Sequence, residues 1–163
     1  DDANIAGDAS ITVSSQTAAN VSALNDGYLT MHNSEIHSFT KEFDFTDEKV
    51  TITLKFDDYR KICGIMVYNS CNEQNAFYNV AKIEMDAKIK SSSAKVVINN
   101  LAYDWDSYVG IGIQSGTSAI AVFSEIEVKE ISFVIYNYNI GDDASLYSGI
   151  TSISEIAVIG LPN

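Results

Sequence analysis

Aromatic side chains occur in several segments that separate the apolar runs of this sequence, and they are candidates for ligand contact. Trp105 is flanked by acids, and Tyr147 lies within the glycine-bounded segment Gly141–Gly149. Tyr68 leads into an amide-rich stretch. An aromatic face stacks on the C–H face of a neutral sugar, while nearby polar groups bind its hydroxyls. Each ring also has a plainer interpretation, since Tyr68 could cap a core and Trp105 could be a half-buried packing residue.

Catalytic chemistry is not indicated by the ionisable residues. Glycoside hydrolysis needs two carboxylates facing each other across a cleft, and no pairing motif is visible. The two histidines, His32 and His37, are too few for a three-histidine metal site. Nucleophile-elbow, phosphate-loop and zinc signatures are absent. Adjacent acids such as Asp57 and Asp58 are typical of solvated turns.

The elements that must position the candidate residues are β-strands, because most apolar residues alternate with polar ones at a two-residue period. Ala18–Asn25 could form one short helical turn, but no long amphipathic helix is present. Short strands separated by polar turns predict one all-β domain over residues 1–163, an antiparallel β-sandwich of the jelly-roll kind. The strands are predicted over Val50–Phe56, Ile62–Tyr68, Val80–Asp86, Lys95–Leu101, Ser118–Phe123, Ile131–Tyr136 and Ile153–Ile159.

The composition narrows the class of partner. The chain has 163 residues, which suits one domain, and its 22 acidic and 10 basic residues give a formal net charge of -12. Such a surface repels nucleic acid and anionic lipid headgroups. A neutral glycan or a metal ion fits this charge better, and a strongly acidic polysaccharide would need a bridging cation.

The two cysteines are not expected to form a disulfide. Cys63 and Cys71 are eight residues apart in or beside one predicted strand, which places them farther apart than a disulfide allows. Cys63 is predicted to be a small core residue and Cys71 a free thiol in a loop. No apolar run of about 20 residues predicts a transmembrane helix. The start at Asp1, without a methionine, suggests a domain excised from a larger protein.

Three stretches together resemble the galactose-binding-like sandwich of discoidin-type modules, also called coagulation factor type C domains. The first is Ile11–Ser15 followed by Val21–Gly27, similar to the opening strand, turn and Asp-Gly of that family. The second is the pair Val50–Phe56 and Ile62–Tyr68, similar to its central strands. The third is Ile153–Gly160, similar to its closing strand.

The resemblance implies a structural calcium ion where the first loop meets the closing strand. Its side-chain ligands would be Asp26, Ser34 and Glu155, with the backbone carbonyls of Leu24 and Ser154 completing the shell. Ca²⁺ takes six to eight hard oxygen ligands, which these groups can supply. Glu155 also lies in an otherwise apolar strand, where a carboxylate needs a partner. The alternative is an ordinary Asp-Gly turn and a solvent-facing Glu155.

The resemblance also adds three candidates to the ligand-binding aromatics. Asn69 and Asn75 lie roughly where the family carries ligand-binding polar residues, and His32 lies in the first loop, where some relatives place a ligand-binding histidine. The plainer alternatives are loop hydrogen bonds for the asparagines and an ordinary surface histidine.

In bacteria, domains of this family are commonly appended to glycoside hydrolases, where they bind sugars without doing chemistry. The resemblance therefore implies a secreted or cell-surface carbohydrate-binding module, monomeric within a modular enzyme. Such a module would raise the effective concentration of the enzyme at a neutral polysaccharide or glycan. A protein-interaction or adhesion domain and a structural spacer are the alternatives on the same fold.

Overall fold

The computed structural model describes residues 1–29, 38–43, 49–71, 77, 80–101, 117–136 and 149–163. Nine strands and two short 3₁₀ helices lie in this part of the chain. Their bounds are β1 Ala3–Asn4, η1 Ala6–Asp8, β2 Ser10–Val13, β3 Ala18–Ala19, η2 Val21–Asn25, β4 Phe39–Phe43, β5 Lys49–Asn69, β6 Val80–Ile89, β7 Ser92–Leu101, β8 Ser118–Tyr136 and β9 Gly149–Gly160.

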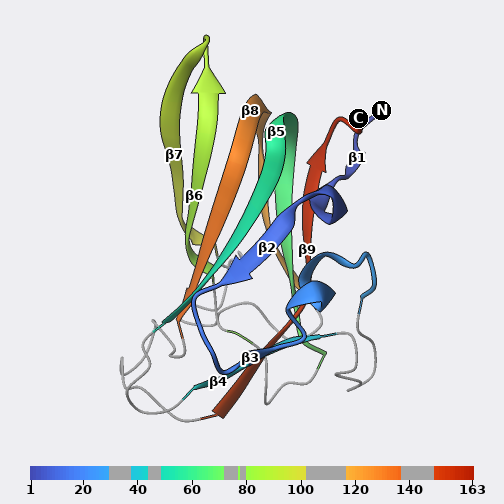
Figure 1. Cartoon of the computed structure of the whole chain (residues 1–163), viewed down its shortest axis with the longest axis vertical. Coiled ribbons are helices and arrows are strands. Elements are labelled where there is room, and N and C mark those ends of the chain that lie inside the picture. Colours follow the sequence, from blue (N-terminus) through green and yellow to red (C-terminus); the bar gives the residue numbers. More distant parts are fainter. Residues whose placement is uncertain (30–37, 44–48, 72–76, 78–79, 102–116, 137–148) are drawn as a thin grey trace, which may run out of the picture.

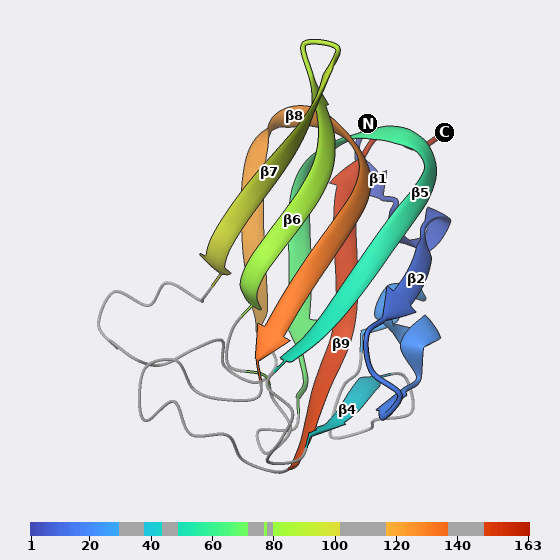
Figure 2. The same ribbon diagram turned by 60° about the vertical axis from the view of Figure 1, so that its left-hand side comes forward.

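The strands form two facing layers (Figures 1 and 2). One layer holds β2, the first half of β5, the second half of β8, β6 and β7. The other holds β3, β4, β9, the second half of β5 and the first half of β8. All of these pairings are antiparallel, and β5 and β8 bend over at one end to serve both layers, so the hydrogen-bonded path is continuous.

The core lies between the layers and follows the alternation of the sequence. In the first half of β5, Val50, Ile52 and Leu54 are buried, while Thr51 and Thr53 between them are partly exposed. The other inward side chains come from β8 and β6 in the same layer and from β9 in the facing layer. They are Ile131, Phe133 and Ile135 of β8, Ile83 and Met85 of β6, and Ile153, Ile156 and Val158 of β9.

The bend of β5 is fastened to both chain ends. Arg60 is almost fully buried there, and its guanidinium donates to Asp8 Oδ2 at 2.9 Å and to the Leu161 carbonyl at 3.0 Å. The same guanidinium lies over the ring of Phe56, 5.5 Å from its centroid. Both termini therefore lie at the end of the sandwich where β5 and β8 bend (Figure 1).

The antiparallel β-sandwich predicted from the alternation is confirmed, and Val21–Asn25 is the expected helical turn. Two details differ. The predicted strands Val50–Phe56 and Ile62–Tyr68 are halves of one bent strand. The prediction of a core position for Cys63 is wrong, because a register irregularity between Ile62 and Gly64 turns this thiol partly outward, 3.5 Å from Asp2 Oδ2. Neither cysteine is in a disulfide.

Candidate functional site

Two carboxylates from opposite ends of the sequence meet beneath η2. Asp26 directly follows η2, and Glu155 lies on β9 with only 2% of its surface exposed. Glu155 Oε2 accepts a hydrogen bond from the Gly27 backbone N–H at 2.9 Å. Its other oxygen, Oε1, is buried and has no hydrogen-bond partner among the residues that the structure describes. A buried carboxylate oxygen in this state calls for a proton or a cation.

The electrostatics of this pair lead to the same requirement. Burial raises the pKa of Glu155 from 4.5 to about 8, and the neighbouring Asp26 carboxyl adds to the rise through hydrogen bonding and charge. The backbone N–H groups of Gly27 and Ile156 act in the opposite direction. A buried carboxylate beside a second, exposed carboxylate is costly to ionise unless a positive charge lies near both. The pair therefore suits a hard cation, and without one Glu155 holds its proton up to a raised pH.

Of the other predicted calcium ligands, two lie within the described residues and one does not. Leu24 is fully buried within η2, beside Asp26 in sequence. Ser154 is buried on β9, where the register against β5 shifts between Tyr68 and Asn69. Ser34 lies outside the described residues. No cluster of three His, Cys, Asp or Glu side chains that could hold a metal occurs in the described ranges.

Gly27 is the residue of this site that the sequence reasoning did not single out. Its φ is +85°, a left-handed conformation that glycine adopts without strain. This conformation presents the Gly27 N–H to Glu155, while Asp26 Oδ1 accepts from the Tyr28 N–H at 2.8 Å. The Asp-Gly dipeptide was the available signal, since it marks tight turns with positive φ.

Tyr68 lies next to this pair. It is directly opposite Glu155 in the β5–β9 ladder, so the two side chains share one face of the sheet. The Tyr68 hydroxyl contacts Met66 Sδ at 3.2 Å, and the ring is partly buried. The structure thus places one predicted sugar-binding residue, Tyr68, beside Glu155 of the carboxylate pair that is predicted to bind calcium.

Asn69 is buried and fastens the segment that follows β5. Its Oδ1 accepts from the backbone N–H groups of Ser70 and Phe77 at 2.9 Å, and its Nδ2 donates to the Phe77 carbonyl at 2.8 Å. The side chain therefore closes the chain between residues 69 and 77 onto itself. Asn69, which was predicted to bind ligand, therefore has a structural role: its side chain holds the two ends of the segment 69–77 together.

Asn69→Ala is expected to lower the free energy of unfolding by about 2 kcal/mol, because it leaves two buried backbone groups of Phe77 without partners. Urea denaturation followed by tryptophan fluorescence measures this change. Asn69→Asp is the isosteric comparison, and it is expected to be at least as unstable at neutral pH, because it buries a carboxylate against the Phe77 carbonyl. Equal stability of wild type and Asn69→Ala would contradict the structural role.

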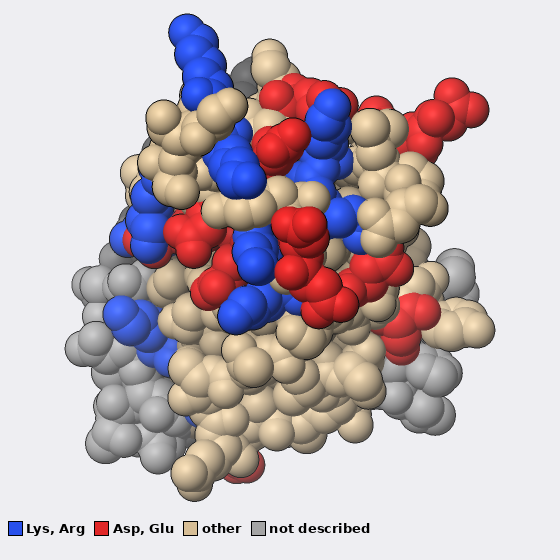
Figure 3. All heavy atoms as spheres, turned by 45° about the horizontal axis from the view of Figure 1, so that its top comes forward, with Lys and Arg blue, Asp and Glu red and all other residues tan. Residues whose placement is uncertain are grey.

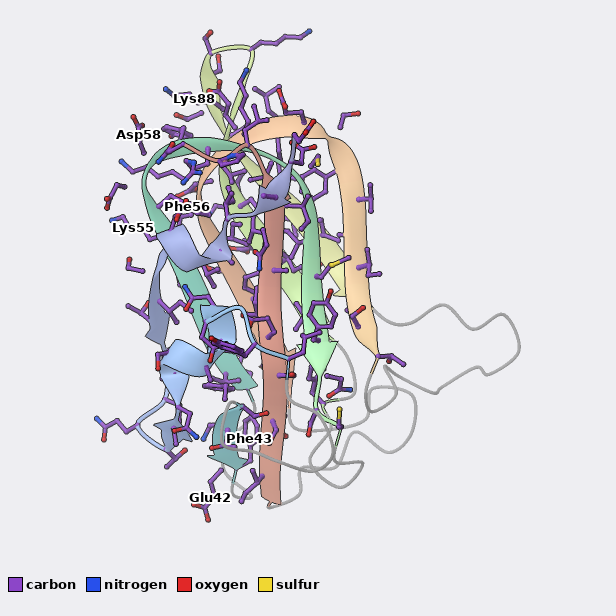
Figure 4. The ribbon with its side chains drawn as sticks, turned by 90° about the vertical axis from the view of Figure 1, so that its right-hand side faces the viewer. Glu42, Phe43, Lys55, Phe56, Asp58 and Lys88 are labelled. Carbon is purple, nitrogen blue, oxygen red and sulfur yellow. The ribbon has the colours of Figure 1, made fainter. Side chains whose placement is uncertain are left out.

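The remaining predicted sugar-binding residues, His32, Asn75, Trp105 and Tyr147, lie outside the described residues. The described strand ends show where their segments leave the sandwich. In Figure 4 the labelled Glu42 and Phe43 of β4 mark that end, while Lys88 and Asp58 mark the opposite one. Their assignment to sugar binding stays a prediction.

No protein-family model matches the sequence, and no curated relative matches it either. Solved structures do. The family 32 carbohydrate-binding module of NanJ from C. perfringens, in complex with galactose, aligns with a TM-score of 0.60 and 16% identity over 97% of this chain and 98% of that one. The chain has the discoidin-like galactose-binding fold. The fold that the resemblance to discoidin-type modules implied is thereby confirmed.

Two further structures share the galactose-binding fold with this chain. A mutant lectin-binding domain of lectinolysin, complexed with Lewis b, aligns with a TM-score of 0.61 and 12% identity over 98% of this chain and 97% of that one. A Ruminococcus gnavus GH29 fucosidase, in complex with fucose, aligns with a TM-score of 0.59 and 14% identity over 99% of this chain. The chain spans only 27% of that fucosidase.

Proposed function

We propose that this chain is a non-catalytic carbohydrate-binding module that holds an attached glycoside hydrolase near a neutral glycan. The observation that carries the proposal is the galactose-binding fold, shared over nearly the full length of two sugar-bound domains. The module works by raising local concentration, so it needs no chemistry of its own. Its place of action would be outside the cell, where polysaccharides occur, and it would act as a monomer.

The charge distribution supports a neutral glycan as the ligand. All ten basic residues belong to the described part of the chain, whereas nine acidic residues and no basic one belong to the segments outside it. Those segments include His32, Asn75, Trp105 and Tyr147. The segments that contain these predicted residues therefore carry acidic side chains and no lysine or arginine, which disfavours the binding of an anionic sugar to them.

The described carboxylates support a role without catalysis. Asp26 and Glu155 lie close together, but Glu155 is buried and its Oε2 is engaged by a backbone N–H. A hydrolytic pair must instead face a substrate and a water molecule across an open cleft. The pair is thus suited to a structural part.

The sugar-binding proposal is tested by affinity electrophoresis in gels containing neutral polysaccharides, together with a glycan array. Trp105→Ala is expected to weaken binding at least about tenfold, because a stacking ring of this kind is a dominant contact. Tyr59→Ala is the matched control, since it removes a ring at the bend of β5, beside the chain termini, and should leave retardation unchanged.

Two results would count against the proposal in different ways. If wild type is retarded by no neutral polysaccharide and captured by no neutral glycan, the carbohydrate function is wrong, and an interaction domain or spacer becomes the better hypothesis. If wild type binds but Trp105→Ala binds equally well, the function stands and the assigned residue is wrong.

We also infer that Asp26 and Glu155 hold a structural Ca²⁺. The support is the orphaned Glu155 Oε1 and the second carboxylate beside it. Leu24 and Ser154 carbonyls and the Ser34 hydroxyl would add the hard oxygens that Ca²⁺ prefers. Such an ion would neutralise the pair and tie the η2 segment to β9, so its effect would be on stability.

A further inference from the structure

A charged cleft lies at the end of the sandwich that carries the termini, opposite the end marked by Glu42 and Phe43 of β4 (Figure 4). It has a volume of about 500 Å³, within the range of small-ligand sites. The β6–β7 turn, the bend of β8 and the bend of β5 enclose it. Its walls are formed by Lys61, Lys88, Ile89, Lys90, Ser91, Glu125, Ile126 and Glu127. Figure 3 shows lysine and arginine side chains gathered among acidic ones at this end.

Three strands place a row of alternating charges along the cleft. Glu127 of β8 is directly opposite Lys61 of β5 on one side and Lys88 of β6 on the other. Lys88 is held by the ring of Tyr59, with its Nζ 4.3 Å from the ring centroid. Lys61 Nζ lies 3.8 Å from Glu125 Oε1. Three ammonium groups and two carboxylates thus line one wall, in a protein whose overall charge is strongly negative.

The turn that carries Lys90 into the cleft is strained. Lys90 and Ser91 form the two-residue connection between β6 and β7, with φ values of +49° and +67°. Such a turn needs positive φ at both positions, which is why Asn-Gly is preferred there. A lysine and a serine are less stable in this conformation. Residues in such conformations cluster at functional sites, which makes this turn a candidate for one.

We propose that this cleft is a second ligand site, which binds an acidic sugar unit such as a uronic acid. Lys88 and Lys90 would bind the sugar carboxylate by charge-assisted hydrogen bonds. Glu127 and Ser91 would accept hydrogen bonds from its hydroxyls, and Ile89 and Ile126 offer apolar contact to its C–H groups. Within the described residues Lys90 has no ion-pair partner, so its charge is available to a ligand.

The two glutamates distinguish this ligand from the alternatives. An acidic peptide carries several carboxylates and few hydroxyls, so Glu125 and Glu127 would repel it. A neutral sugar would leave the excess positive charge of the cleft uncompensated. A sugar with one carboxylate and several hydroxyls matches both the lysines and the glutamates.

The test is an NMR titration of ¹⁵N-labelled protein with D-galacturonate, alongside D-galactose, which differs in lacking the carboxylate. Galacturonate is expected to shift the amides of residues 88–91 and 125–127, whereas galactose should leave them unmoved. Lys90→Gln is expected to weaken galacturonate binding roughly tenfold. Lys55→Gln, the same charge change outside the cleft, should leave the affinity unchanged.

A second variant guards against an effect of misfolding. Replacing Lys90→Asn and Ser91→Gly together installs the preferred turn, so it is expected to raise the melting temperature by roughly 2–4 °C while abolishing galacturonate binding. Trp105→Ala should leave this binding intact, which separates the site from the proposed neutral-glycan site. The proposal is overturned if galacturonate shifts no cleft amide, if Lys90→Gln binds as wild type does, or if a tetra-aspartate peptide binds more tightly than galacturonate.

Discussion

Chelating calcium with EDTA is expected to lower the melting temperature of this protein by about 5–10 °C. A metal present at a hundredfold excess over its dissociation constant adds about 2.7 kcal/mol to the folded state. In a domain of this size each kcal/mol moves the melting temperature by about 2–4 °C. The effect is expected because Glu155 Oε1 is buried without a hydrogen-bond partner among the described residues and lies beside a second carboxylate, that of Asp26.

The Glu155→Gln variant separates a metal effect from a general one. It keeps the size of the side chain but removes the charge, so calcium should no longer change the melting temperature. Its metal-free form is expected to remain folded, because the amide avoids the burial of a second carboxylate beside Asp26. Asp57→Asn, which removes an exposed charge far from η2, should respond to calcium as wild type does. A wild-type protein whose melting temperature ignores both calcium and EDTA would contradict the inferred site.

The stability of the metal-free protein is expected to fall as the pH rises, and the stabilisation by calcium is expected to grow. In the metal-free protein the pKa of Glu155 is about 8, above its ordinary value of 4.5, so the folded state holds this proton more tightly than the unfolded state. Stability from this group is complete below pH 4.5 and is lost as the pH rises through about 8. Calcium needs the ionised carboxylate, so its stabilising effect should increase over the same interval. Calorimetry of wild type and Glu155→Gln in EDTA and in calcium measures both trends.

The sandwich could be predicted from the sequence because its signal is local. Val50, Ile52 and Leu54 alternate with threonines, and each such run specifies a strand with one buried face. Where one strand serves both layers, the signal fails. The residues between Phe56 and Ile62 read as a turn between two strands, whereas the structure has one strand that continues around the bend from Lys49 to Asn69.

The candidate site was predictable only in part, for a related reason. An acid within an apolar strand is a visible anomaly, so Glu155 could be singled out by itself. Its partner at Asp26 could not be derived from local pattern, because 128 residues separate Glu155 from Gly27, whose N–H it accepts. The family resemblance supplied that pairing. The burial of Asn69 and the outward turn of Cys63 depend on irregular registers, which no two-residue period encodes.

Gly160 is the position where one added methyl group is expected to do the most damage. A Cβ there would lie 2.2 Å from the Lys61 carbonyl oxygen and 3.0 Å from Ile62 Cγ2. Gly160 is paired with Ile62 on one side and with Ala3 on the other, so the backbone has no room to retreat. Gly160→Ala is expected to lower the free energy of unfolding by about 3 kcal/mol, through backbone displacement and overpacking. Urea denaturation measures the loss.

Gly64→Ala provides the matched control on the neighbouring strand. A Cβ at Gly64 would meet the Ala121 carbonyl oxygen at 3.5 Å and Ile159 at 3.6 Å, which are ordinary contacts, so we expect a change of less than about 1 kcal/mol. If the two variants were equally stable, the close approach of β9 to the bend of β5 would be wrong.

The Leu161 N–H donates to the same Lys61 carbonyl at 3.0 Å, and Arg60 binds the Leu161 carbonyl. Gly160→Ala should therefore also displace Lys61 at the edge of the charged cleft, and weaken galacturonate binding in a way that Gly64→Ala does not.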